Sequence, residues 1–499
     1  MLDLFGSSQA GERKVLRPHQ EQAIAMVRRS LGSGNRRVVL QGAVGFGKTL
    51  VSARIIEGAL SKGNRVVFTA PMISLIDQTV AAFQAEGIED IGVIQANHPR
   101  TNPSARVQVA SVQTLQRRGI PEAALVIVDE AHIQFREINR LMDERRDVFF
   151  VGLSATPWSQ GMGLRWQDLV IPCTISSLIK AGFLSQFTVY APDVPDLSRV
   201  KVERGDYVEG QLAEVMGDAA LVGNVVATWL EKGEGRPTLV FGVNRAHAKA
   251  LMGQFLNAGV SAAYVDGFTD SVERGVINRQ FRAGDIRVIC SVRTMTTGVD
   301  LPVSCIVDAA PTKSEALHVQ KIGRGLRVNP GTEDLVVFDH AGNSLRLGLV
   351  TDIHHETLDK TKPGQRQASN GNTAKSPDAL PKPCSECGAL FTGLVCPSCG
   401  HERKPAHGVK CAEGELVILS GRKAAATRED KARFYAMALW LDRERQKSGR
   451  LAKGLFRGKF GEWPDRVYAD PIPPDASFMS YERSRRIAYA KSKARGAQA

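Results

Sequence analysis

A glycine-rich segment, GAVGFGKT at residues 42–49, constrains the fold of this 499-residue chain more than any other feature. It matches the pattern GxxxxGK[ST], whose backbone N–H groups surround phosphates where a strand turns into a helix. The apolar run RVVLQ precedes it and residues 49–60 have the periodicity of a helix, a context that a chance match would lack. We therefore predict an ATP site in which Lys48 reaches the β- and γ-phosphates and Thr49 holds Mg²⁺. The glycines that allow the phosphates to approach are Gly42, Gly45 and Gly47.

Short runs rich in Val, Ile and Leu alternate with amphipathic helical stretches twice along the front of the chain. Such alternation predicts an α/β fold with parallel sheets that are buried on both faces. Prolines and charged residues between 192 and 235 separate the two series. We expect tandem domains at residues 1–195 and 196–355, followed by a polar, flexible linker at 356–382.

The net charge of +13 is concentrated at the rear of the chain. Residues 361–499 contain 26 Lys and Arg against 14 Asp and Glu, whereas residues 1–360 contain 39 against 38. A nearly neutral front and a basic rear indicate an enzymatic core with an appended region that meets a polyanion, and nucleic acid is the polyanion favoured. A solubilising tail is the alternative.

Simple patterns argue against secreted and membrane proteins. No apolar stretch approaches the roughly 18 residues that span a bilayer, and the N-terminus lacks the basic-then-apolar order of a signal peptide. Cys173, Cys290 and Cys305 are scattered, as expected of reduced core thiols. We expect a cytoplasmic protein without membrane contact.

The segment VIVDEAH at residues 126–132 places two adjacent carboxylates at the end of an apolar run. At the carboxyl edge of a buried sheet, Asp129 would meet Mg²⁺ and Glu130 could polarise the attacking water. A surface pair that caps the next helix is the alternative. The catalytic interpretation is favoured because the glycine-rich loop can share the same sheet.

Positive charge for the far side of the γ-phosphate is offered by QKIGRGLR at residues 320–327. Gln320, Arg324 and Arg327 are the candidate catalytic residues of this segment. The two arginines lie about one helical turn apart, which suits an arginine-finger role across a cleft between domains. An exposed basic helix is the alternative. Asp300, in the polar turn TTGVDLP, could sense nucleotide or touch a sugar–phosphate backbone.

Four cysteines form two CxxC pairs, Cys384 with Cys387 and Cys396 with Cys399. Four thiolates at this spacing suit tetrahedral Zn²⁺, and so short a segment with almost no core needs a metal for stability. We predict a structural zinc ribbon at residues 383–402 in preference to a redox dithiol pair.

Residues 403–499 show helical patterning rich in Ala, Arg and Lys, interleaved with aromatic residues. The region could bind nucleic acid, with basic residues on phosphates and aromatics on bases, or it could be a protein-docking helix pair with its own small core. The charge surplus favours nucleic acid.

In their order along roughly residues 13–345, these segments resemble the motifs of a superfamily 2 helicase core. LRPHQ resembles the adenine-reading element, GAVGFGKT motif I, TAPMISLIDQ motif Ia, VDEAH motif II, SAT motif III, LVFGVNRAHA motif IV, TTGVDLP motif V and QKIGRGLR motif VI. The chain is similar to the bacterial and phage DNA group, which includes XPB-like proteins, UvsW-like phage helicases and type III restriction subunits. Its cysteine site and tail resemble those of RadD-like DNA repair helicases.

The resemblance implies two RecA-like domains that use ATP and Mg²⁺, a Zn²⁺ site, and single-stranded, duplex or branched DNA as the partner. Arg17 and Gln20 would contact adenine, and Ser154 and Thr156 would couple ATP to nucleic acid. It also implies a role in DNA repair, recombination or replication at the nucleoid of a bacterial or phage-infected cell. Recombination and single-strand-binding proteins are candidate partners. An RNA helicase and a nucleic-acid-binding adaptor that uses ATP as a switch are the alternatives, and a nuclease-bearing restriction subunit ranks below them.

Overall fold

The computed structural model describes most of the chain, and it divides into two compact units, residues 1–405 and 406–499, which are considered separately. The described residues are 13–191, 195–203, 205–217, 219–292, 301–329, 334–362, 380–403, 427–465, 467–475, 477–479, 481–483 and 485–486. Among them, no helix combines the length and the apolar character needed to cross a membrane.

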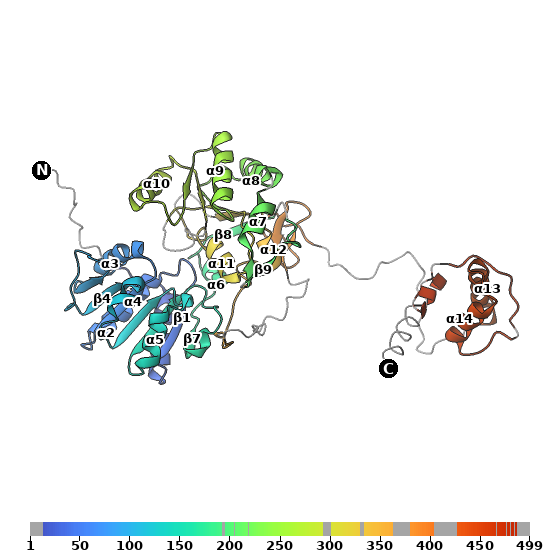
Figure 1. The fold of residues 1–499 in the computed structure, drawn as a ribbon, viewed down its shortest axis with the longest axis horizontal. Coiled ribbons are helices and arrows are strands. Elements are labelled where there is room, and N and C mark those ends of the chain that lie inside the picture. Colours follow the sequence, from blue (N-terminus) through green and yellow to red (C-terminus); the bar gives the residue numbers. More distant parts are fainter. Residues whose placement is uncertain are drawn as a thin grey trace. The chain divides into compact units, whose positions relative to one another are not determined.

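The first unit begins with a seven-stranded sheet in the order β3-β4-β2-β5-β6-β1-β7, in which all the pairings are parallel (Figure 1). Its strands are β1 (Arg37–Gln41), β2 (Val66–Ala70), β3 (Ile91–Ile94), β4 (Val107–Ser111), β5 (Leu125–Asp129), β6 (Phe149–Ser154) and β7 (Asp168–Val170). The connecting helices are α1 (Pro18–Gly32), α2 (Lys48–Leu60), α3 (Ile76–Ala85), α4 (Val112–Arg118), α5 (Arg136–Glu144) and α6 (Ile175–Lys180). We call this part lobe 1.

The strands of lobe 1 are buried because helices cover both faces of the sheet. Every residue of β2 and β4 is buried, including the polar Thr69, Gln108 and Ser111, as expected of central strands in a sheet that is covered on both faces. The carboxyl ends of β1 and β5 reach the same edge of the sheet, β1 before the glycine-rich loop and β5 at Asp129. A parallel sheet therefore brings the two phosphate-handling segments together, although they are far apart in the sequence.

Lobe 2 is built on an eight-stranded sheet in the order β12-β13-β11-β14-β15-β8-β17-β16. The strands are β8 (Gln186–Tyr190), β11 (Thr238–Phe241), β12 (Ala262–Val265), β13 (Val288–Ser291), β14 (Cys305–Asp308), β15 (Asp334–Asp339), β16 (Lys382–Pro383) and β17 (Ala389–Phe391). A small hairpin, β9 (Val202–Glu203) with β10 (Asp206–Tyr207), lies outside the sheet. Its helices are α7 (Glu209–Met216), α8 (Ala219–Lys232), α9 (Arg245–Asn257), α10 (Ser271–Ala283), α11 (Glu315–Gly323) and α12 (Asn343–Leu347). Two parallel-sheet α/β domains confirm the predicted fold class.

Two parts of the chain extend this second sheet beyond what sequence periodicity indicated. One is strand β8, and the other is the cysteine hairpin, which we define as β16 and β17 with the cysteine pairs that adjoin them. Strand β8 pairs in parallel with β15, although it precedes the expected domain junction at 195/196. On its other side β8 pairs antiparallel with β17, which follows the first cysteine pair. The cysteine segment is thus an edge of lobe 2.

The second unit has a small apolar core formed by α13 (Arg428–Glu444), α14 (Arg450–Phe460) and the segment around Phe478. Aromatic side chains fill this core: Phe434 contacts Phe460 and Phe478 with ring centroids 5.2 and 4.9 Å apart. Residues 427–460 therefore confirm the predicted helical character of the C-terminal region, and most of its aromatics serve its own core.

Candidate active site

The glycine-rich loop connects β1 to α2, as the sequence predicts. Gly45 and Gly47 have φ angles of 81° and 85°, in the left-handed region where a side chain would be strained. A Cβ on Gly42 would lie only 2.8 Å from Cδ1 of Phe46, so this position also excludes larger residues. Lys48 is the first residue of α2, and its Nζ lies 3.4 Å from the Gly42 carbonyl oxygen. The loop is therefore shaped to surround an anion at a helix N-terminus.

Gln20 contacts the glycine-rich loop directly. Its Nε2 donates to the Phe46 carbonyl oxygen at 2.8 Å, and its Oε1 accepts from the Arg17 N–H at 2.9 Å. A Cβ on Gly47 would collide with the same amide group. The Arg17 guanidinium lies over the ring of Phe183, 4.9 Å from its centroid. Arg17 and Gln20 thus stand beside the loop, at the place where the resemblance puts adenine contacts.

Asp129 and Glu130 lie at the carboxyl end of β5, on the same sheet edge as the loop. Burial raises the pKa of Asp129 to about 7, and the Glu130 charge adds to this rise. Burial would raise the pKa of Glu130 too, but the Lys48 ammonium and His132 lower it to about 2. Two adjacent carboxylates with such different pKa values need an added cation for both to be ionised comfortably near neutral pH.

Glu130 also has an unusual backbone, with φ 48° and ψ 49°. A non-glycine residue in the left-handed region costs on the order of 1–3 kcal/mol and is concentrated at functional sites. This conformation places the Glu130 carboxylate 3.3 Å from Nδ1 of His132.

A chain of polar contacts leads from these acids to lobe 2. Nδ1 of His132 lies 2.9 Å from Oγ of Ser154, which accepts the N–H of Thr156 at 3.1 Å. Gln320 of α11 donates from Nε2 to Oγ1 of Thr156 at 2.8 Å and lies 3.4 Å from Nε2 of His132. Sequence reasoning missed His132, and its position two residues after Glu130 is the signal that could have found it.

The arginine segment, residues 320–327, packs on the glycine-rich loop. A Cβ on Gly323 would lie 2.6 Å from Cγ2 of Val44, so only glycine allows α11 to approach the loop this closely. Arg324 is buried, 8% exposed, and its charge is among those that lower the pKa of Glu130. Cγ of Arg327 would lie 3.6 Å from a Cβ on Gly45. Both arginines therefore lie next to the phosphate loop rather than on an exposed helix.

Buried polar contacts fix α11 within lobe 2. Nζ of Lys321 lies 2.7 Å from Oδ1 of Asp308 and donates to the Ala310 carbonyl oxygen at 2.7 Å. Nδ2 of Asn343 donates to Oδ2 of Asp308 at 2.8 Å. Sequence reasoning missed these residues because a buried lysine paired with a strand-end aspartate has no local signature. Asp300 and residues 296–299 of its turn lie outside the described residues.

The four cysteines come together as the spacing predicts. Their sulfur atoms all lie within 4.8 Å of one another, with Cys384 to Cys399 at 3.7 Å and Cys387 to Cys396 at 3.8 Å. Four sulfurs at Zn–S bonds of about 2.3 Å around a tetrahedral ion would be about 3.8 Å apart, whereas a disulfide needs about 2.05 Å. Backbone hydrogen bonds at Cys387 and Glu386 lower the pKa of Cys384 to about 6, which favours the thiolate that binds metal. Despite a backbone hydrogen bond at His401, the neighbouring sulfurs raise the pKa of Cys399 to about 12, so without a metal the group would share protons.

Family models match both lobes. Residues 13–159 match the model described as "Type III restriction enzyme, res subunit", and residues 220–329 match "Helicase conserved C-terminal domain". A 51.5 kDa protein of a Lactococcus phage is 26% identical over 397 residues, covering 77% of this chain and 83% of that protein. The putative ATP-dependent helicase IRC3 of Saccharomyces cerevisiae is 28% identical over 367 residues, covering 68% of this chain and only 53% of that protein.

Solved structures share the fold. A fragment of a putative HsdR subunit of a type I restriction enzyme from Vibrio vulnificus matches with a TM-score of 0.55 at 18% identity, over 71% of this chain and 68% of that chain. The Type ISP restriction-modification enzyme LlaBIII, solved bound to DNA, matches with a TM-score of 0.51 at 17% identity, over 65% of this chain and 28% of that chain. With the ordered motifs and the two matched models, these findings assign the chain to a family of nucleic-acid-dependent ATPases: it belongs to the superfamily 2 helicases, in their DNA group.

Proposed function

We propose that this protein couples ATP hydrolysis to movement along DNA or to its remodelling, in DNA repair, recombination or replication. One observation carries the proposal: Lys48, Glu130 and Arg324 lie around a single loop, although the first two come from lobe 1 and the third from lobe 2. A triphosphate bound at this loop would touch both lobes. Its hydrolysis would then change the contact between them, which is the requirement for a motor.

The residues at the loop divide the work of phosphoryl transfer. Lys48 and the loop N–H groups would hold the β- and γ-phosphates, and Glu130 would orient the attacking water. Arg324 and Arg327 would stabilise charge on the transferring group from the lobe 2 side. Thr49, exposed in the first turn of α2, and Asp129, a carboxylate at the end of β5 whose pKa is raised by burial and by the Glu130 charge, fit the ligand set of Mg²⁺, which would neutralise phosphate charge.

The thiol cluster fits a structural Zn²⁺, because all four tetrahedral positions are taken by sulfur and the spacing of the sulfurs matches. Such a closed site leaves no position for substrate. We therefore assign it a structural role.

DNA would meet lobe 1 at the edge near Pro71 and α4. Nε2 of Gln113 donates to the Pro71 carbonyl oxygen at 2.9 Å and joins these two segments into one surface. We expect this surface to contact the sugar–phosphate backbone of DNA, so binding would be largely independent of the DNA sequence.

A second DNA contact is proposed for α14 in the C-terminal unit. This helix carries four basic residues and no acidic one, and all four are exposed: Arg450, Lys453, Arg457 and Lys459. None of the four forms an ion pair within the described residues, so no acidic side chain there neutralises them directly. The Arg457 guanidinium lies over the ring of Trp463, 4.6 Å from its centroid, and this tryptophan is 49% exposed. Cations beside an exposed aromatic ring suit a single strand, whose phosphates and bases they can contact together.

Gly454 strengthens this assignment. It lies within α14, where glycine costs roughly 1 kcal/mol relative to alanine, yet a Cβ there would meet nothing within 4 Å. Internal packing therefore does not explain why this position is a glycine. Close approach of a DNA phosphate backbone to the helix would explain it.

The motor assignment is tested by ATP turnover of the full chain with single-stranded DNA, duplex DNA, branched DNA and RNA in parallel. We expect stimulation by DNA and loss of turnover in the Lys48→Ala variant, with its thermal unfolding unchanged. Stronger stimulation by RNA would support the RNA helicase alternative. Turnover without stimulation by any nucleic acid would favour the adaptor and overturn the proposal.

The α14 contact is tested by the salt dependence of DNA binding. The variant Lys453→Glu/Arg457→Glu should weaken binding and lower the slope of log K against log salt by about 2, since two phosphate contacts are lost. Lys447→Glu, an exposed charge change outside α14, is the control. An unchanged slope in the double variant, together with loss of binding to an acidic peptide, would assign α14 to protein docking instead.

A further inference from the structure

We propose that the cysteine hairpin is a positioning element of the ATPase, which holds Arg327 in place through strand β8. The inference deepens the proposed function and rests on it, because it takes Arg327 as part of the ATP site. A zinc ribbon that only bound DNA would not need to share a sheet with the lobe that carries the arginines.

The hairpin is built into lobe 2 at the far end of β8. Ala389 and Leu390 of β17 pair with Tyr190 and Val189, so the hairpin continues the sheet through main-chain hydrogen bonds. Tyr190 also packs against the cysteine cluster, next to the buried side chain of Phe391. The end of β8 is therefore covered by residues that the metal would hold in position.

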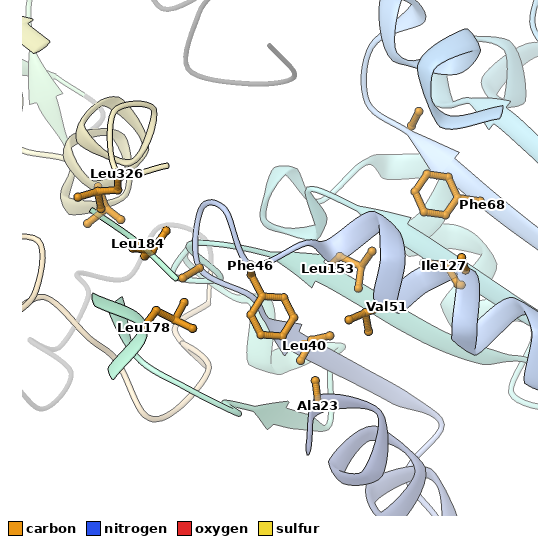
Figure 2. Close-up of a cluster of buried hydrophobic side chains, with 14 of the residues drawn as sticks. Ala23, Leu40, Phe46, Val51, Phe68, Ile127, Leu153, Leu178, Leu184 and Leu326 are labelled. Atoms are coloured by element: carbon orange, nitrogen blue, oxygen red, sulfur yellow. The ribbon is translucent and has the colours of Figure 1, made fainter. Parts of the chain in front are cut away.

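The near end of β8 holds the arginine segment. The N–H of Ser185 donates to the Leu326 carbonyl oxygen at 2.8 Å, and its Oγ donates to that of Arg327 at 3.2 Å. Leu184 forms a bridge with Arg327, and its Cδ2 would lie 2.9 Å from a Cβ on Gly45. Figure 2 shows Leu184 between Leu326 and the loop that carries Phe46. Leu184 and Ser185 thus contact both the phosphate loop and the main chain of the catalytic arginine.

Strand β8 joins these two ends over a short distance. Its five residues span about 17 Å, and it lies between β15 and β17. Strand β17 of the hairpin has only two paired positions with β8 and two with its partner β16, too few to hold the hairpin without the metal. Loss of the metal would turn β8 into an edge strand and loosen the residues that fix Arg327.

A shift of Arg327 should appear in kcat rather than in ATP binding. Lys48 and the loop N–H groups would still hold the nucleotide, whereas charge on the transferring phosphoryl group would be less well stabilised. A misplacement of about 1 Å can cost about 100-fold in rate.

The experiment compares the full, zinc-loaded chain with Cys387→Ser and Cys396→Ser at saturating DNA. We expect loss of zinc, faster hydrogen exchange in residues 184–190, and kcat lower by roughly tenfold to 100-fold with KM for ATP within about twofold. His401→Ala is the matched control, because its ring lies beside the hairpin, 3.0 Å from Oγ of Ser385, but outside the four-sulfur cluster. This variant should still bind zinc, and its hydrogen exchange in residues 184–190 and its kcat should equal those of the unmodified chain.

A second variant keeps the test valid should the cysteine variants fail to fold. Ser185→Ala keeps the metal site and removes one hydrogen bond to Arg327, so it should lower kcat by about threefold to tenfold without changing KM. Zinc loss that weakens DNA binding but leaves kcat and exchange at 184–190 unchanged would overturn the proposal, as would an unchanged kcat in Ser185→Ala. Absence of DNA-stimulated turnover in the unmodified chain would instead refute the proposed function.

Discussion

Gln320 and Thr156 are joined by a 2.8 Å hydrogen bond from Nε2 to Oγ1, which links α11 of lobe 2 to the end of β6 in lobe 1. Thr156 is connected through Ser154 and His132 to Glu130, so three further contacts lead from this bond to the group proposed to orient water. A motor needs such a link, because each lobe must register the state of the other.

The first prediction concerns that bond. Gln320→Ala should lower DNA-stimulated kcat by about fivefold, since a neutral hydrogen bond contributes about 1 kcal/mol and its loss leaves Thr156 without this contact from lobe 2. Thr156→Val should act similarly. The double variant should cost no more than either single variant, and an additive loss would show that the two residues act separately.

A second prediction separates hydrolysis from binding. Glu130→Gln keeps the size of the side chain but removes its charge, so ATP should still bind while kcat falls by at least about 100-fold. Single-turnover hydrolysis and nucleotide binding should be measured on the same preparation. Residual turnover close to that of the unmodified chain would remove Glu130 from the reaction.

Gly323 provides a third prediction, in which local stability and activity move in opposite directions. Gly323→Ala should favour the α11 helix by roughly 0.5–1 kcal/mol, yet its Cβ would press against Val44 of the phosphate loop. We expect a higher KM for ATP and a lower kcat. Adding Val44→Ala should restore both, and a failure of this rescue would place the defect elsewhere.

His247 predicts a pH dependence of lobe 2. Burial lowers its pKa to about 4, and its Nδ1 accepts the Val243 N–H at 3.2 Å, so the folded state holds the ring neutral. As pH falls, the His247 ring takes up a proton near pH 6.5 in the unfolded state but only near pH 4 in the folded state. The free energy of unfolding is therefore unaffected above pH 6.5, and it falls by about 3 kcal/mol as the pH drops toward 4. Exchange protection of α9 should follow this profile, and His247→Gln should flatten it. Parallel profiles for the two proteins would contradict the assignment.

Asp442 predicts the stability of the C-terminal unit. Its buried carboxylate accepts the N–H groups of Gly449 and Ala452, both at 2.8 Å, and so supplies negative charge to the start of the basic helix α14. Asp442→Ala should destabilise this unit by about 2–4 kcal/mol. Exchange in residues 450–460 is the measurement, with the exposed Asp470→Ala as control. Equal protection in both variants would show that the cap is dispensable.

The sequence predicted the parts of this molecule whose signals are local. The glycine-rich loop, Asp129 and the paired cysteines each carry their chemistry in a few neighbouring residues, and the order of the motifs along the chain indicated the family. Strand β8 could not be placed in this way, because its partners β15 and β17 lie far away in the sequence. The residues of a strand do not indicate which distant strands it pairs with. The Lys321–Asp308 pair was missed for a similar reason, since its partners meet only after the sheet has formed.

The way the cysteine hairpin ends the second sheet has a further consequence for solubility. An exposed strand edge can pair with the edge strand of another chain, which leads to aggregation. The rim strand here is β16, only two residues long, and consists of a charged Lys382 and of Pro383, which has no N–H to donate. The same hairpin that continues the sheet therefore also blunts it against neighbouring copies of the protein.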